Sequence, residues 1–507
     1  MIRLAQTSSR LLLAFFAGVL LVLASVGSAT AAVTPHSGPA SGGTTITIDG
    51  IHFVKVEGGT FHTLGLTSEG TVYAWGGNDF GQLGDGTNSR RSTPVQVLGS
   101  GGTGFLTGVT DISAGGLHSL ALTPTGLLAW GYNAMGQLGD GSTTNRLFPV
   151  LVTGGLSGVT AISAGNIHSL ALASGGAYAW GNNSYGQLGD GSTTNRLSPV
   201  PVTGGLSGVT AISAGAVFSM ALAASGVYSW GQNADGELGD DSFTDRLSPV
   251  PVTGGLSGVT AISAGTTHAL ALTSNGLYSW GINYAGQLGN GSTNVSKVPV
   301  QVAGGLTGIA AIATGSQFSL VLTNSGIYGW GFNGGGQLGD GTTTDRSVPV
   351  LVSGSLPGVS AISAGANHAL AISSGGAYAW GFNQYGQLGD GSLSNHAIPV
   401  LSANFQPVGV SFGATVGTGL VTAGNVWTVT SPGGATGQVV VSGEARVFGG
   451  TAAATPTSVT WNAGTFTYET ALANTGSYDF APSGLVGFGA LLGGIAILLG
   501  FRRFQKV

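Results

Sequence analysis

Residues 259–302 read VTAISAGTTHALALTSNGLYSWGINYAGQLGNGSTNVSKVPVQV. Short runs rich in β-branched, aromatic and small apolar residues occupy 259–265, 268–272, 277–281 and 298–302. Turn residues, many of them glycine, separate these runs, and none has helical periodicity, so the stretch predicts four β-strands. Four strands in about 50 residues is the size of a propeller blade, and four to eight such blades close a ring.

The same unit recurs along the chain, and a tryptophan marks each copy. The first gap between these tryptophans is 55 residues, and the next five gaps are 50 residues each. A residue present in every copy supports the blade, because catalysis needs one asymmetric set of groups. The structural repeat residues are Trp75, Trp130, Trp180, Trp230, Trp280, Trp330 and Trp380.

Three motifs connect the repeat to a known family. They are Ala-Gly-x-x-His-Ser-Leu-Ala-Leu, Trp-Gly-x-Asn-x-x-Gly-Gln-Leu-Gly and a strand containing Pro-Val. Over residues 54–403 they resemble regulator of chromosome condensation repeats, and this resemblance implies a seven-bladed β-propeller. Because residues 53–57 open the first unit and 398–401 end the last with Pro-Val, we expect these two segments to pair and complete the seventh blade.

The N-terminal end predicts export. Arg3 and Arg10 precede an apolar run over 11–26, and small residues follow at 28–32. This is the order of a secretory signal peptide, predicted here as residues 1–31, with a membrane anchor as the alternative. The chain contains no cysteine, so neither disulfides nor thiolate metal sites contribute.

The C-terminal end, residues 470–507, resembles a Gram-positive cell-wall sorting signal. An apolar stretch over 485–501 predicts a membrane-spanning helix, and Arg502, Arg503 and Lys506 follow it. Upstream lies a pentapeptide with alanine where the family usually has proline: Leu472, Ala473, Asn474, Thr475 and Gly476. The resemblance implies that a sortase cuts after Thr475 and links it to the wall. The alternative is a plain single-pass membrane anchor.

The segments on either side of the repeats predict a second, interrupted domain. Residues 32–53 resemble the opening of an immunoglobulin-like IPT/TIG domain, and 404–469 match its later strands. Because a closed ring brings its own ends together, such a ring is tolerated as an insertion. An orphan N-terminal strand with a separate C-terminal domain is the alternative. The chain is therefore predicted to be all-β: a seven-bladed propeller inserted in an immunoglobulin-like β-sandwich, with a signal peptide and a C-terminal hydrophobic helix.

Two repeated residue types could suggest metal sites but favour structural roles. Histidine recurs at one position in five repeats, but Phe218 and Phe318 fill that position in the other two. A site that accepts phenylalanine is a packing position. Asp-Gly pairs such as Asp140-Gly141 indicate turns, because calcium loops need several spaced carboxylates. No metal or other cofactor is expected.

The candidate binding face comes from loop positions that differ among otherwise similar repeats. Aromatic residues in loops on a stiff scaffold are frequent binding anchors, although glycine-rich loops also bury aromatics against their own backbone. The candidates are Tyr132, Met135, Tyr185, Tyr284, Phe332, Phe382 and Tyr385.

Charge narrows the choice of partner. Removal of residues 1–31 and 476–507 leaves 9 basic and 18 acidic side chains, a net charge of −9, which argues against a nucleic-acid partner. No catalytic set stands out, so the chain is predicted not to be an enzyme.

We therefore expect an exported protein of the cell wall or cell surface, attached to the membrane through its C-terminal segment before or instead of sorting. The propeller would bind a protein or glycan of the cell envelope. Relatives in the family include an exchange factor for a small GTPase, a plant light sensor and secreted β-lactamase inhibitors. The alternative function is accordingly inhibition of a β-lactamase or a cell-wall enzyme, followed by nucleotide exchange through family analogy.

Overall fold

The computed structural model describes residues 51–402 with their side chains, and outside them the backbone of the strands β1–β3 and β32–β39. Every regular element among these residues is a β-strand. No helix in the described part is long and apolar enough to cross a membrane. The chain divides into two units, which are taken separately below.

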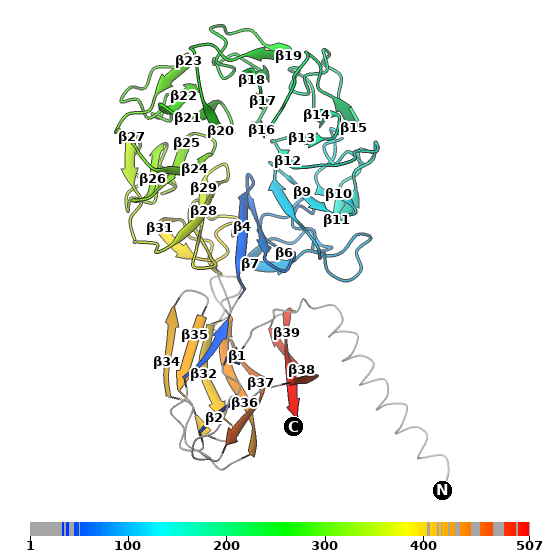
Figure 1. The fold of residues 1–507 in the computed structure, drawn as a ribbon, viewed down its shortest axis with the longest axis vertical. Coiled ribbons are helices and arrows are strands. Elements are labelled where there is room, and N and C mark those ends of the chain that lie inside the picture. The colour runs from blue at the N-terminus through cyan, green and yellow to red at the C-terminus, as the bar shows by residue number, and fades with distance from the viewer. Residues whose placement is uncertain are drawn as a thin grey trace, which may run out of the picture. The chain divides into compact units, whose positions relative to one another are not determined.

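Residues 53–401 form seven four-stranded antiparallel sheets around a central axis (Figure 1). The blades, numbered in chain order, contain the following strands. Blade 1 has β4 (Phe53–Gly58), β5 (His62–Thr67), β6 (Val72–Gly76) and β7 (Arg91–Gln96); blade 2 has β8 (Asp111–Ala114), β9 (His118–Thr123), β10 (Gly126–Gly131) and β11 (Arg146–Leu151); blade 3 has β12 (Ala161–Ala164), β13 (His168–Ala173), β14 (Gly176–Gly181) and β15 (Arg196–Pro201); blade 4 has β16 (Ala211–Ala214), β17 (Phe218–Ala223), β18 (Gly226–Gly231) and β19 (Arg246–Pro251); blade 5 has β20 (Val259–Ala264), β21 (His268–Thr273), β22 (Gly276–Gly281) and β23 (Ser296–Gln301); blade 6 has β24 (Ile309–Thr314), β25 (Phe318–Thr323), β26 (Gly326–Gly331) and β27 (Arg346–Leu351); blade 7 has β28 (Val359–Ala364), β29 (His368–Ser373), β30 (Gly376–Gly381) and β31 (His396–Leu401).

Within each blade the strands pair in chain order from the axis outward. In blade 3, Ile162 on β12 faces Ala171 on β13, and His168 on β13 faces Gly181 on β14. The pairing of β14 with β15 shifts between Ala179 and Gly181, at the tryptophan position. The expected seven-bladed propeller is confirmed.

The outermost strand of each blade contains a proline near its middle. Because proline lacks an N–H, it is tolerated only at a sheet edge, where it blocks pairing with another chain. The seven prolines are Pro94, Pro149, Pro199, Pro249, Pro299, Pro349 and Pro399. They protect the seven outer edges of the ring against aggregation.

The expected closure of the ring by strand exchange is wrong. Residues 53–57 lie in β4, which pairs with β5, and 398–401 lie in β31, which pairs with β30. The first unit supplies its own Pro-Val strand, β7, so no blade lacks a strand for the other end of the chain to fill. The two terminal blades meet side by side instead, with the Phe53 N–H donating to Gly375 O at 2.9 Å.

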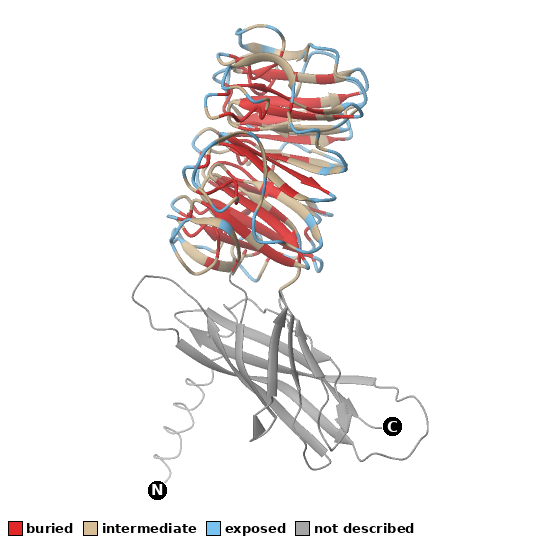
Figure 2. Cartoon of the chain, turned by 90° about the vertical axis from the view of Figure 1, so that its left-hand side faces the viewer, coloured by how far each residue is buried: buried red, intermediate tan, exposed pale blue. Residues whose placement is uncertain are grey.

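The apolar core lies between blades rather than inside single ones. One cluster joins Leu120, Leu138 and Val152 of blade 2 to Ile162 and Trp180 of blade 3, and Trp180 is fully buried. Gly139 lies against the Trp180 ring, where an added Cβ would be only 2.8 Å from Nε1. In Figure 2 the buried residues of the ring lie mostly in its strands, and the exposed residues lie mostly in its loops.

Strands before and after the ring pair with each other in a second unit. Its two sheets have the orders β1-β3-β35-β34 and β2-β37-β36-β32-β33. Thr47 on β3 faces Thr428 on β35, and Gly38 on β2 faces Tyr468 on β37. The bounds are β1 (Val33–Thr34), β2 (Ser37–Pro39), β3 (Thr45–Asp49), β32 (Gln406–Phe412), β33 (Thr415–Val416), β34 (Thr418–Ala423), β35 (Val426–Thr430), β36 (Gly437–Val447) and β37 (Thr457–Glu469). An interrupted domain requires pairing of this kind, and its IPT/TIG identity stays a prediction.

The C-terminal segment differs from the expected helix. β38 (Ala481–Leu492) and β39 (Ile495–Gln505) are two antiparallel strands that cover the stretch 485–501. Glycines at 487, 489, 493, 494 and 500 weaken a helix there, since each costs about 1 kcal/mol relative to alanine. The signal peptide and the sorting pentapeptide lie outside the described residues.

Candidate functional site

A buried histidine of one blade bonds to a hydroxyl of the next blade at five of the seven interfaces. His168 Nε2 lies 2.9 Å from Ser219 Oγ, and this hydroxyl donates to Gln187 O at 2.8 Å. Because the one hydroxyl hydrogen goes to the carbonyl, Ser219 accepts from the Nε2–H of His168. The same arrangement joins His62 to Ser119, His118 to Ser169, His268 to Ser319 and His368 to Thr63, at 2.8–3.0 Å.

Burial keeps these histidines neutral. All five are fully buried, and their Nδ1 atoms have no hydrogen-bond partner among the described residues. Burial lowers the pKa of His62, His118 and His368 to about 3, and of His168 and His268 to about 4. The position therefore packs and orders blades, and it does not present an ionisable ring to solvent.

At the two interfaces that lack the histidine, the hydroxyl residue of the next blade is replaced as well. Where Phe218 replaces histidine, Ala269 replaces serine in the next blade, and Phe318 is matched in the same way by Ala369. A histidine facing alanine, or a serine facing phenylalanine, would leave a buried polar group with one partner fewer. Each interface is therefore either fully polar or fully apolar at this point.

Three circles of hydrogen bonds run around the ring, each with one bond per interface. The inner circle joins backbone groups of the turns nearest the axis at 2.9–3.4 Å, for example Ala216 N to Gly265 O and Ala366 N to Gly59 O. In the middle circle each repeat tryptophan donates from Nε1 to the carbonyl of Gln or Glu237 in the preceding blade, at 2.9–3.0 Å. The outer circle joins each long loop to the next outer strand at 2.8–3.1 Å, as in Gly391 N to Ser92 O.

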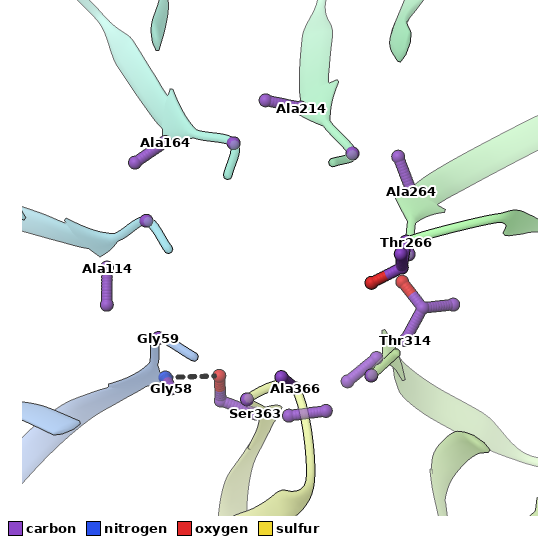
Figure 3. Close-up of a pocket in the computed structure, with 18 of the residues that line it drawn as sticks. Gly58, Gly59, Ala114, Ala164, Ala214, Ala264, Thr266, Thr314, Ser363 and Ala366 are labelled. Atoms are coloured by element: carbon purple, nitrogen blue, oxygen red, sulfur yellow. Dashed lines mark hydrogen bonds between the residues drawn. The ribbon is translucent and has the colours of Figure 1, made fainter. Parts of the chain in front are cut away.

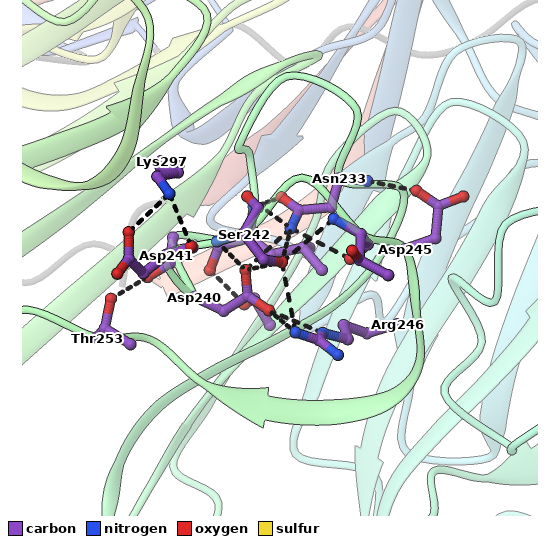
Figure 4. A network of polar contacts seen from close by, with 12 residues as sticks. Asn233, Asp240, Asp241, Ser242, Asp245, Arg246, Thr253 and Lys297 are labelled. Carbon is purple, nitrogen blue, oxygen red and sulfur yellow. Dashed lines mark hydrogen bonds and ion pairs between the residues drawn. The ribbon is translucent and has the colours of Figure 1, made fainter.

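The long loop after each tryptophan strand is held by its asparagine and an acidic or amide side chain. In blade 4, Asn233 Oδ1 accepts from Leu238 N, and Nδ2 donates to Asp240 Oδ1, both at 2.9 Å (Figure 4). Arg246 donates from Nε to Asp240 Oδ2 at 2.8 Å. Burial alone would raise the pKa of Asp240, but bonds from Ser242 and Arg246 hold it below its usual range. The carboxylate is thus occupied by donors of its own loop, in agreement with the turn interpretation.

The short turns and long loops that could bind a partner lie at one end of the ring. His118 faces Gly131, so the short turn before β9 and the long loop after β10 lie at the same end of blade 2, and the other blades repeat this. We call this end the loop face. It consists of the turns 59–61, 115–117, 165–167, 215–217, 265–267, 315–317 and 365–367, with the loops 77–90, 132–145, 182–195, 232–245, 282–295, 332–345 and 382–395.

Aromatic side chains concentrate on the loop face of three consecutive blades, 7, 1 and 2. Phe61 and Tyr385 have ring centroids 4.3 Å apart, and Phe382 lies 6.3 Å from Tyr385. Phe80 and Tyr132 meet edge to face at 4.9 Å. We call these five residues the seam aromatics. Arg90 lies over the Tyr385 ring at 4.4 Å, a cation–π contact, and pairs with Asp79 at 3.3 Å.

The seven candidates from the sequence fall into three groups. Tyr132, Phe382 and Tyr385 belong to the seam aromatics and are half-buried. Tyr185 and Tyr284 stand apart in blades 3 and 5 and are exposed by 42% and 70%. Met135 and Phe332 are half-buried in blades 2 and 6. All seven lie on the loop face, but they do not form one cluster.

A cavity of about 480 Å³ opens at the centre of the ring (Figure 3). Its wall consists mainly of glycine, alanine, serine and threonine of the innermost strands and turns, with Ala114, Ala164, Ala214 and Ala264 arranged around the opening. Of the described residues that line it, Glu57 is the one ionisable side chain. The cavity wall includes the turns 59–60 and 115–116, so it belongs to the loop face.

A charged triad accompanies Glu57 at the junction of blades 1 and 2. Lys55 Nζ lies 2.6 Å from Asp111 Oδ1 and 3.1 Å from Glu57 Oε1, and it donates to Ile112 O at 2.9 Å. Burial alone would lower the pKa of Lys55, but the two carboxylates together raise it. The other blades have alanine in place of Lys55 and Asp111, so the triad breaks the sevenfold repeat.

Comparison with known families agrees with this geometry. The model of the RCC1-like domain matches residues 25–371, more than half of the chain. The chain belongs to the RCC1-like domain family. Regulator of chromosome condensation (RCC1) repeats also match residues 374–417 and 359–387.

Individual relatives of this RCC1-like chain are similar over short stretches. It is 40% identical over 99 residues to the ultraviolet-B receptor UVR8 of Arabidopsis thaliana, covering 19% of this chain and 22% of the relative. It is 39% identical over 105 residues to the probable E3 ubiquitin-protein ligase HERC4 of Homo sapiens, covering 20% and 10%. The matched stretches thus span less than a quarter of these relatives.

Solved structures share the fold. Human WBSCR16 superposes with a TM-score of 0.58 at 24% identity, covering 71% of this chain and 98% of that one. Prp20p of Saccharomyces cerevisiae superposes with a TM-score of 0.57 at 23% identity, covering 72% and 92%. At these identities the likeness concerns the fold alone.

Several residues of the RCC1-like loop face were missed by sequence reasoning. Phe80 occupies the same repeat position as Met135 and Tyr385, so alignment of the first repeat on Trp75 would have found it. The other repeats have no aromatic residue at the position of Phe61, and they have serine or alanine at the position of Glu57, so a search for deviations would have marked both. Tyr385 lies in the last blade and Phe61 in the first, and only closure of the ring brings the two residues together.

Proposed function

We propose that this chain is an exported binding protein of the cell envelope, and that its loop face holds a protein or glycan partner through the seam aromatics. The observation that carries the proposal is the gathering of five aromatic rings from three blades on one arc. In blades 4, 5 and 6 the position of Tyr385 holds Asp235, Ala285 and Gly335. Rigid aromatic side chains supply contact area at a small loss of conformational entropy, and they are frequent hot spots.

A binding role is supported by one relative and by the state of the polar groups in the ring. UVR8 is described as a receptor, whereas HERC4 is described as a probable E3 ubiquitin-protein ligase. In this chain the buried histidines and the loop carboxylates are engaged between and within blades, so neither group supplies an exposed catalytic set. Nucleotide exchange through family analogy remains a prediction.

The binding proposal is tested on the purified full-length protein. Phe382→Ala with Tyr385→Ala should remove capture of the partner from a cell-envelope extract and weaken its affinity about a thousandfold, since two hot-spot residues each contribute about 2 kcal/mol. Phe243→Ala is the control, because Phe243 is an aromatic residue of the loop face, exposed by 55%, that lies in blade 4 and outside the seam aromatics.

Binding that survives in the double variant at wild-type affinity would contradict the proposal. The identity of the captured partner separates the two functions predicted from the sequence. If it is a β-lactam-hydrolysing or wall-cleaving enzyme whose activity falls on binding, the chain is an inhibitor. If it is a structural protein or a wall glycan, the chain is a surface binding module.

Anchoring to the envelope is the second part of the proposal, and its support is in the sequence alone. The pentapeptide 472–476 precedes an apolar stretch and a basic end, in the order of a sorting signal. We expect mass spectrometry of wall digests to find Thr475 joined to a peptidoglycan peptide. Thr475→Ala should abolish this product. Recovery of the chain only with Val507 intact, in the membrane fraction, would contradict sortase processing.

A further inference from the structure

The central cavity differs from the rest of the loop face in chemistry. Its wall carries hydroxyl groups from all seven blades, among them those of Thr60, Ser163, Thr266, Thr314 and Ser363. Figure 3 shows Thr266 and Thr314 side by side at the opening. A volume of about 480 Å³ falls in the range of small-molecule sites, which is about 300–1,000 Å³. The cavity is therefore large enough for a slender polar ligand.

One repeat position introduces a charge into this neutral wall. The residue is serine in blades 2, 3, 4, 5 and 7, alanine in blade 6, and Glu57 in blade 1. A serine at this position bonds to the next blade, as Ser163 Oγ does by accepting from Ala214 N at 2.9 Å. Ring assembly thus uses a small hydroxyl here, and a carboxylate is not needed for it.

The charge of Glu57 is only partly compensated. Lys55 is shared between two carboxylates and lies closer to Asp111, at 2.6 Å, than to Glu57, at 3.1 Å. The second oxygen of Glu57, Oε2, is 3.5 Å from Ser363 Oγ. The triad of one cation and two anions carries a net negative charge. Low-dielectric walls focus such a field on the cavity.

We propose that the central cavity is a binding site for a primary ammonium group carried on a hydroxyl-rich molecule, with Glu57 as its counter-ion. The hydroxyl and backbone groups of the wall suit a sugar-like carrier, and the carboxylate selects the protonated amine. The site goes beyond the proposed function, because it involves none of the seam aromatics.

The test uses titration calorimetry of the full-length protein at low salt with three probes. The glucosamine trisaccharide should bind, and its N-acetylated counterpart, which has the same ring but no charge, should bind at least about tenfold more weakly. Trilysine supplies the amine on a peptide and should also bind more weakly than the glucosamine trisaccharide. Equal binding of the acetylated sugar would overturn the role of charge, and tighter binding of trilysine would overturn the hydroxyl-rich carrier.

Two variants and two controls complete the test. Glu57→Ser, which copies the residue of five other blades, and Glu57→Gln should each lower affinity for the glucosamine trisaccharide at least about tenfold without lowering the melting temperature. Glu69→Gln, in the turn at the other end of blade 1, should leave affinity unchanged. Retained affinity in both Glu57 variants would refute the proposal. The Phe382→Ala, Tyr385→Ala protein should still bind the sugar, so failure of the seam proposal is distinguishable from failure of this one.

Discussion

Acidification to pH 5 should destabilise the propeller by several kcal/mol through its five interblade histidines. In the unfolded chain these histidines bind protons near pH 6.5, whereas in the folded ring they do so only near pH 3 to 4. Between pH 6.5 and 4 the unfolded chain therefore binds more protons, and stability falls as the pH falls. Each histidine contributes a slope of up to about 1.4 kcal/mol per pH unit.

Urea unfolding followed by tryptophan fluorescence, at pH values from 7.5 to 4.5, measures this effect. The chain offers its own control, since His168→Phe with Ser219→Ala copies the Phe218–Ala269 interface. This double variant should lower the slope by about one fifth, because one of five histidines is gone. A change in unfolding free energy below about 1 kcal/mol between pH 7 and 5 would contradict the neutral, buried state of the histidines.

Glu237 should change the free energy of unfolding with pH in the opposite direction to the histidines, so its effect has to be measured separately from theirs. It replaces a glutamine of the other blades, is buried, and its Oε1 has no partner among the described residues. Burial raises the pKa of Glu237 to about 7, so the folded ring holds this proton more tightly than the unfolded chain. Its contribution is present in acid and is lost as the pH rises through 7. Repeating the series in Glu237→Gln isolates the histidines.

The second large effect concerns the pairing of histidine with serine. Phe218→His should destabilise the ring by about 2–3 kcal/mol, because the new Nε2–H would face the methyl group of Ala269 in a fully buried place. Ala269→Ser in the same chain should recover most of this loss. The added hydroxyl accepts from the new histidine and donates to Glu237 O, as Ser219 does to Gln187 O at the preceding interface.

A double-mutant cycle of unfolding free energies measures the coupling. We expect about 2 kcal/mol between positions 218 and 269, whereas Ala269→Ser alone should change stability by less than about 1 kcal/mol. As a matched pair from distant blades, Phe218→His with Ala369→Ser should show no coupling, because Ala369 faces Phe318. Additive effects at 218 and 269 would show that the paired exchange seen in the sequence has no energetic basis.

The fold was predictable from the sequence because each blade repeats the same local signals. Tryptophan spacing, Gly-rich turns and the Pro-Val strand recur with a period of 50 residues, and the longer first gap is a turn closed by the bridge between Leu98 and Phe105. The closure of the ring was mispredicted because a periodic pattern does not show where one unit ends. The last Pro-Val strand, 398–401, was expected to pair with 53–57, whereas it lies in β31 and pairs with β30 of its own blade.

The candidate site was predictable only in part. Tyr132, Phe382 and Tyr385 stood out as large residues at variable loop positions, but their neighbours Phe61 and Phe80 did not enter the prediction. Contacts such as Tyr385 with Phe61 join segments more than 300 residues apart and exist only after ring closure. The central cavity has the same origin, since seven short segments from separate repeats form its wall.

The three circles of interblade bonds give the ring no preferred starting point. Blades 7 and 1 meet through the same kinds of bond as any other neighbours: Ala366 N to Gly59 O, Trp75 Nε1 to Gln387 O and Gly391 N to Ser92 O. A circularly permuted gene, opened between any two blades and rejoined through a short linker at 402 and 53, would encode the same set of contacts. The interblade contacts therefore do not depend on which blade comes first in the chain. They do depend on which blades are neighbours, because each interface needs a matching histidine–serine or phenylalanine–alanine pair.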